Sequence, residues 1–137
     1  MDKKDIQSIV LANRYRLISE FNFSCKDTAA NCAYKLTQNA ISKKYIEPRD
    51  SVRGETLRKW AKDKNPPQWA CRSAADLLVS INYDFRNKED IFLAVYFFLL
   101  NNEFDSAEMA IGKLPSFLND EYCQGLVDTF FNAGVLQ

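Results

Sequence analysis

The spacing of apolar residues constrains the fold of this chain more than any other feature. From Ile6 to Phe21, apolar side chains recur every three or four residues, the period of one face of an α-helix. The 4 Gly and 4 Pro residues are too few for a turn-rich all-β fold. We therefore predict an all-α protein whose helices span about residues 5–22, 28–46, 51–65, 67–79, 88–101, 105–114 and 120–133.

Capping residues define several of these helix ends. Pro67 suits the first position of a helix because its missing N–H is not needed there. The residue before Pro48 is pushed out of the α region, which predicts a helix end at Glu47. Other predicted caps are short polar side chains at helix starts and a glycine at the last helix end: Asp27 or Thr28, Asp50 or Ser51, Asn87, Asp105, Asn119 or Asp120, and Gly134.

Charge divides the chain into two parts of opposite sign. Residues 1–72 hold 15 Lys and Arg against 8 Asp and Glu, whereas residues 73–137 hold 3 against 10. Such asymmetry indicates contact with nucleic acid or a membrane surface by one part. We predict a basic DNA-binding region over 1–82 and an acidic helical region for dimerisation or partner binding over 83–137.

Cations are densest between residues 43 and 64. The eight are Lys43, Lys44, Arg49, Arg53, Arg58, Lys59, Lys62 and Lys64. A clustered basic stripe is the electrostatic footprint of a protein that binds a polyanion. Four acidic residues, Glu47, Asp50, Glu55 and Asp63, are interleaved with the cations, so an ordinary solvated surface of mixed charge remains the alternative.

The segment from Ser51 to Pro67 reads SVRGETLRKWAKDKNPP and is followed by AADLL at 74–78. Over about residues 47–80 it resembles the recognition-helix end of helix-turn-helix repressors of the Cro/CI-like superfamily. There, a helix with a Trp near its end is followed by a basic turn, a proline and a helix with small and Leu positions. The resemblance implies a helix-turn-helix-type N-terminal bundle, with its turn at 47–50.

A helix that enters the major groove meets base edges with outward side chains near its N-terminus. With Leu57, Trp60 and Ala61 facing the core, the predicted helix directs its cations outward. The candidates for base contact are Ser51, Arg53, Thr56, Arg58 and Lys59. The candidates for phosphate contact are Lys43, Lys44, Arg49, Lys62 and Lys64.

The acidic part is rich in large apolar residues. Residues 99–110 resemble the inter-helix corner of a tetratricopeptide-type hairpin, which needs a stacked neighbour to close its core. A second copy of the chain would supply one, and a homodimer would match palindromic half-sites. The interface candidates are Phe92, Val95, Tyr96, Leu99, Phe117, Phe130 and Phe131. The alternative places all of them in the core of one chain.

Several chemistries find no support in the sequence. The chain has no histidine, Gly-rich phosphate loop or paired-carboxylate motif, so we expect no enzyme and no cofactor. Cys25 and Cys32 are seven residues apart, which suits neither a zinc site nor a redox motif, so no metal is expected. Cys32 and Cys71 fall on apolar faces and read as core thiols.

The expected compartment is a reducing cytoplasm. No signal peptide is expected, because the start is charged and no apolar region follows. The longest apolar run has ten residues, too short for a membrane span, so no membrane contact is expected.

Two functions remain from the sequence. The first is a sequence-specific transcriptional regulator, repressor-like and of the kind found in phages or mobile elements, which binds double-stranded DNA through the 52–64 helix as a dimer. The alternative is a non-enzymatic adaptor or inhibitor that docks on a protein and does not bind DNA.

Overall fold

The computed structural model describes residues 1–62 and 65–136, and its regular elements are all helical. The α-helices are α1 (Lys3–Asn13), α2 (Tyr15–Ser24), α3 (Ala29–Ser42), α4 (Gly54–Lys62), α5 (Gln68–Ser80), α6 (Lys88–Asn102), α7 (Ala107–Lys113) and α8 (Glu121–Ala133). A short 3₁₀ turn, Ser116–Leu118, precedes α8. The predicted all-α class is confirmed.

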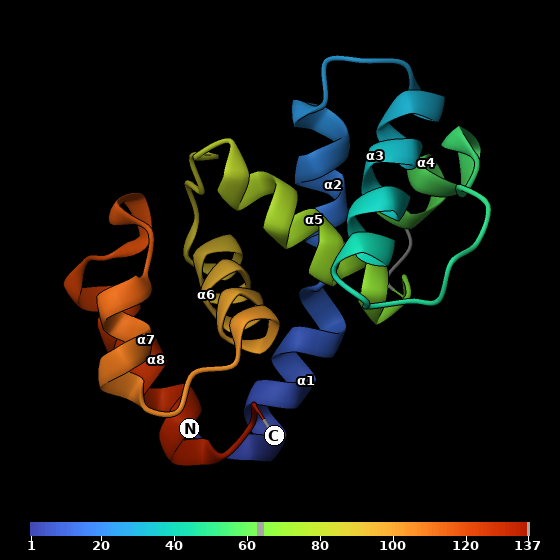
Figure 1. The fold of residues 1–137 in the computed structure, drawn as a ribbon. Helices are drawn as coiled ribbons and strands as arrows, with labels where there is room; N and C mark the ends of the chain where they lie inside the picture. The colour runs from blue at the N-terminus through green and yellow to red at the C-terminus, as the bar shows by residue number, and fades with distance from the viewer. Residues whose placement is uncertain (63–64, 137) are drawn as a thin grey trace.

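The helices pack as two groups (Figure 1). Helices α2, α3, α4 and α5 contact one another at one end of the molecule, and α6, α7 and α8 pack at the other. Helix α1 belongs to the basic part by sequence, yet it packs against α6 and α8. One continuous cluster of buried residues runs from Ile6 to Val135, so the predicted boundary at residue 82 does not divide the core.

A single helix was predicted over residues 5–22, but the chain forms α1 and α2, which meet at Arg14. No Gly or Pro marks the break. Both helices contact α6, but α1 also packs against α8, whereas α2 packs mainly against α4 and α5. Tertiary packing therefore overrides a continuous helical pattern. The Arg14 guanidinium donates through Nη2 to the Pro66 carbonyl at 3.0 Å, which ties the break to the connection before α5.

The predicted continuation of the second helix to Ile46 is wrong. Helix α3 ends at Ser42, because Lys44 adopts a left-handed backbone with φ of 64°. The Tyr45 N–H then donates to the Ala40 carbonyl and the Lys44 N–H to the Ile41 carbonyl, the hydrogen-bond pattern of a Schellman motif. A left-handed lysine carries no sequence signal as clear as glycine, so the sequence did not reveal this stop.

Four predicted caps are confirmed, but the predicted helix start at Asp50 or Ser51 is wrong, because α4 begins at Gly54. The side chains of Thr28, Asn87 and Asp120 accept hydrogen bonds from backbone N–H groups in the first turns of α3, α6 and α8. Gly134 ends α8 with φ of 67°. At α7 the cap is Ser106 rather than the predicted Asp105, because the Ser106 hydroxyl accepts from the Met109 N–H.

Cys25 and Cys32 form a disulfide, which corrects the prediction of Cys32 as a core thiol. Their separation of seven residues matches no metal or redox motif. The bond forms because α2 ends at Ser24 and the chain then turns back, which brings the first turns of α3 close to Cys25. Cys71 and Cys123 are free and buried. Within the described ranges, no helix has the length and apolar character needed to cross a bilayer.

Candidate cationic DNA-binding face

Helix α4 presents a cationic outer face. Leu57 and Ala61 are buried against α2 and α3, and the half-buried Trp60 packs edge-to-face on Trp69 of α5 with ring centroids 5.6 Å apart. This fixes the orientation of the helix. The cations on the remaining surface are all exposed: Arg53, Arg58, Lys59 and Lys62. Ser51 and Thr56, also candidates for base contact, are only half-exposed.

Helices α3 and α4 are joined by residues 43–53, which we call the strap. The resemblance to helix-turn-helix repressors implies a turn of three or four residues here, whereas the strap extends from Lys43 to Arg53. In Figure 1 it leaves the C-terminal end of α3 and returns beside the helix to α4. The candidate face is therefore built from a helix and a flanking extended segment.

Three contacts hold the strap, two near its start and one near its end. Near its start, the Tyr45 hydroxyl donates to Asp76 Oδ2 at 2.6 Å, and the Arg72 guanidinium lies 4.0 Å from the centre of the Tyr45 ring. Burial, together with the Asp76 carboxylate, raises the pKa of the Tyr45 hydroxyl, so it stays protonated and keeps donating at neutral pH. Near the strap's end, the Val52 N–H donates to the buried Thr37 hydroxyl at 3.3 Å.

The strap cations are exposed and lie along α3. Lys43 and Lys44 follow its C-terminal end, while Arg53 lies beside its N-terminal end. A helix of 14 residues spans about 20 Å, so these cations are distributed over that length. Arg49 lies between them, its guanidinium 5.8 Å from the Trp69 ring centre. Trp60 and Trp69 thus connect Arg49 to α4. Lys64 lies outside the described residues.

No acidic side chain of the described residues pairs with a cation of this face. Among residues 1–62 and 65–136, the ion pairs are Arg16–Asp90, Lys35–Asp27 and Arg86–Asp84, and none of them uses a cation of α4 or the strap. Glu47, Asp50 and Glu55 are exposed between the cations without pairing with them. The positive charge is therefore available to an external anion.

Gly54 sets how closely α4 approaches α3. A Cβ added at Gly54 would lie 2.8 Å from the Ala29 Cβ and 2.9 Å from the Ala29 carbonyl carbon. It would also lie 3.0 Å from the Ala30 nitrogen. Since two of these atoms are backbone, the contact cannot be relieved by a side-chain rotation. The start of α4, and with it Arg53, is seated directly on the start of α3.

Replacing Gly54 with alanine should lower the free energy of unfolding by about 1–3 kcal/mol, because the added methyl group overpacks the α3–α4 contact. The matched control is Gly125→Ala in α8, where an added Cβ meets nothing within 4 Å. That change should stabilise by about 0.5–1 kcal/mol through helix propensity. Urea unfolding of both variants measures the difference. Equal effects at the two sites would contradict the close α3–α4 contact.

A group of exposed acidic residues lies at the end of the molecule away from α4 (Figure 1). Glu103, Asp105, Glu108, Asp120, Glu121 and Asp128 are exposed on or beside α6, α7 and α8. The part of the chain described in the structure brings no group of three or more Cys, Asp and Glu side chains together to hold a metal ion. The arrangement is an electrostatic dipole with its positive pole at α4 and the strap.

Most of the predicted interface residues are buried inside a single chain, so the prediction that they form a dimer interface is wrong for these residues. Five of the seven are buried in the core: Phe92, Val95, Tyr96, Leu99 and Phe130. Phe130 packs edge-to-face against both Phe92 and Tyr96, with ring centroids 5.0 and 5.7 Å apart. Helix α8 thus provides the neighbour that was expected from a second copy. Phe117 and Phe131 keep partial exposure.

Sequence reasoning located the exposed cations but missed what positions them. The Gly54 contact and the contacts of the strap join residues that are far apart in the sequence. The disulfide joins residues seven apart, a spacing that matches no known motif. In comparisons with known proteins, no family model, curated protein sequence or solved structure matches this chain.

Proposed function

We propose that this protein binds double-stranded DNA through the cationic face, with α4 in the major groove and the strap along the phosphate backbone. The observation that carries the proposal is the set of exposed cations at the start and on the outer side of α4, Arg53, Arg58 and Lys59, which have no acidic partner among the described residues. Arginine and lysine at such positions contact guanine edges or phosphates.

The dimensions of the face suit a duplex. Helix α4 has 9 residues and is about 13 Å long, and the major groove of B-DNA, about 12 Å wide, accepts an α-helix. Lys43, Lys44 and Arg49 are exposed on the strap, where they can neutralise phosphates farther along the backbone. The acidic end faces away from the DNA in this orientation, so the molecular dipole favours approach with α4 first.

A repressor-like regulator is the specific form of this proposal. Reading a palindromic operator requires a dimer with its two α4 helices about 34 Å apart, one turn of DNA. Phe117 and Phe131 are the remaining candidates for the dimer contact, because they alone of the seven candidates keep surface exposure.

A second candidate function is an adaptor that docks on a protein. The observation that favours it is apolar exposure away from the cationic face: Phe23 at the end of α2 is 76% exposed and Ile81 after α5 is 59% exposed. Large apolar side chains left open to water are frequent at protein-binding sites.

The test is fluorescence anisotropy of a labelled random-sequence duplex, titrated with protein at several salt concentrations. Neutralising five phosphates predicts a slope of log affinity against log salt of about −4 to −5. A control variant, Lys113→Ala on α7 at the acidic end, should leave this slope unchanged. No binding at micromolar protein in about 50 mM salt would contradict DNA binding and favour the adaptor.

A further inference from the structure

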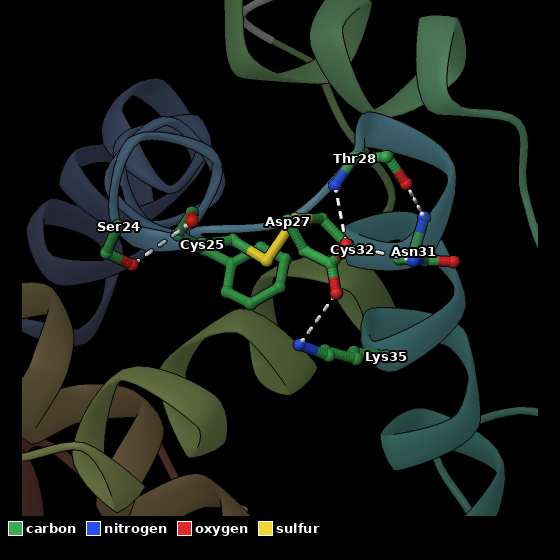
Figure 2. The surroundings of a disulfide bond; sticks show 8 residues. Ser24, Cys25, Asp27, Thr28, Asn31, Cys32 and Lys35 are labelled. Carbon is green, nitrogen blue, oxygen red and sulfur yellow. Dashed lines mark hydrogen bonds and ion pairs between the residues drawn. A yellow bond between two sulfur atoms is a disulfide. The ribbon is translucent and has the colours of Figure 1, made fainter.

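The disulfide encloses the segment that starts α3. Cys25 directly follows α2, and Cys32 lies in the first turns of α3, so the bond closes a ring around residues 26–31 (Figure 2). Within the ring, Thr28 caps α3 by accepting from the Asn31 N–H at 3.1 Å. Asp27 Oδ1 accepts from the Thr28 N–H at 2.7 Å and from Asn31 Nδ2 at 2.9 Å.

The same ring supports the start of α4. Ala29 and Ala30, both inside it, are the residues against which Gly54 packs without room for a Cβ. Arg53 precedes Gly54, and the Arg53 carbonyl accepts from the Leu57 N–H at 3.1 Å, which begins α4. A continuous set of contacts therefore joins the disulfide to the cationic face.

We propose that the Cys25–Cys32 disulfide is a redox switch for the cationic face: the oxidised protein holds α4 in its binding position, and reduction releases it. The inference rests on the proposed DNA binding. With the bond intact, residues 26–31, which are the turn before α3 and the start of the helix, have few alternative conformations, and the α3 cap and the Gly54 contact stay formed. With the bond broken, the turn gains conformational freedom at the position where α4 is seated.

The surroundings of Cys25 allow a reductant to reach the bond. Cys25 is half-buried, whereas Cys32 is buried. Cys25 lines an open hollow of about 230 Å³ together with Lys26, Lys35, Leu77 and Ile81. The Lys26 ammonium group attracts an anionic thiolate, whereas that of Lys35 is paired with the Asp27 carboxylate at 3.4 Å. Attack is therefore expected at Cys25 Sγ from this side.

The reductant is a dithiol. Its thiolate attacks Cys25 Sγ, the Cys25–Cys32 bond breaks, and Cys32 leaves as a thiolate that takes up a proton. The second thiol of the reductant loses its proton and attacks the mixed disulfide, which releases Cys25 as a thiolate that is then protonated. Two electrons pass to the protein, which ends with two thiols, and the reductant ends as a disulfide.

The other two cysteines do not interfere with this exchange. Burial raises the pKa of the Cys71 thiol to about 12 and that of the Cys123 thiol to about 11. Neither is a thiolate at neutral pH, so neither competes for Cys25 or Cys32. A disulfide in a protein that meets DNA inside a reducing compartment is typically of the redox-sensing kind.

The test compares oxidised and dithiothreitol-reduced wild-type protein for binding to the labelled random duplex. Reduction should raise Kd about tenfold, as expected when only about a tenth of the molecules keep the binding conformation. The Cys25→Ser/Cys32→Ser variant retains Cys71 and Cys123. Its Kd for the duplex should equal that of the reduced protein and should not change when dithiothreitol is added. Equal affinity of oxidised, reduced and variant proteins would overturn the switch while leaving DNA binding in place.

Amide hydrogen exchange gives a second readout that needs no DNA. Reduction should speed exchange of the Cys32 and Leu57 N–H groups, which donate to the Thr28 and Arg53 carbonyls, and leave the remote Cys123 N–H unchanged. Faster exchange at Leu57 without DNA binding in either state supports the redox coupling but contradicts the proposed function. If reduction leaves exchange of the Leu57 N–H unchanged, the coupling is contradicted. This measurement uses wild-type protein, so it does not depend on whether the double variant folds.

Discussion

Replacing Arg53, Arg58 and Lys59 together with alanine should weaken binding to duplex DNA by about 100-fold or more in about 50 mM salt. Each of these side chains is exposed on or next to α4 and has no ion-pair partner among the described residues. Each contact to a base edge or phosphate contributes about 1 kcal/mol or more, and three lost contacts combine to this effect. Anisotropy titration measures it.

Two controls show whether the triple variant still folds and whether the loss of binding depends on where the cations lie. The triple variant should unfold within about 0.5 kcal/mol of wild type, because exposed side chains contribute little to the core. A matched variant with Lys3, Lys4 and Lys113 replaced by alanine removes as many exposed cations from α1 and α7. It should retain most of the affinity. If both triple variants lose affinity equally, binding depends on overall charge and α4 has no special role.

Replacing Arg16 with methionine should lower the free energy of unfolding by about 3 kcal/mol, the effect of leaving a buried carboxylate without its partner. Arg16 on α2 donates through Nε to Asp90 Oδ1 at 2.7 Å, and Asp90 on α6 is 2% exposed. The hydrogen bond to Asp90 raises the pKa of Arg16, which remains charged at all working pH values. The pair joins the two helix groups across the core.

The control for this pair is the double variant Arg16→Met/Asp90→Asn. Removing the carboxylate's charge should recover a large part of the lost stability, because no unpaired ion is then buried. Urea unfolding of the single and double variants measures the recovery. A loss below about 0.5 kcal/mol for Arg16→Met would show that water solvates Asp90 as well as the arginine does.

The sequence predicted the local features of the fold well. The helical period and caps such as Thr28, Asn87, Asp120 and Gly134 depend on nearest neighbours, and these predictions are confirmed. The break at Arg14 and the end of α3 at Ser42 were not predicted. The first depends on which helices α1 and α2 pack against, and the second on a lysine in a left-handed conformation that glycine usually occupies.

The candidate site was predicted in part. The cations at Arg53, Arg58 and Lys59 are exposed as expected, since Leu57 and Ala61 fix the buried side of α4. The path of the strap and the Cys25–Cys32 bond were not predictable, because both depend on the way α3 turns back beside α2 and α4. The apolar interface candidates were misplaced because α8 covers α6 within the chain, which a periodic pattern cannot distinguish from coverage by a second copy.

The most direct test of the account is an NMR titration of oxidised, ¹⁵N-labelled protein with a short random-sequence duplex in about 50 mM salt. We predict amide shift changes concentrated in the strap and α4, residues 43–62, with residues 103–128 at the acidic end unchanged. Shifts confined to the acidic end or to the surroundings of Phe23 and Ile81, or no shifts at all, would contradict a DNA-binding face at α4.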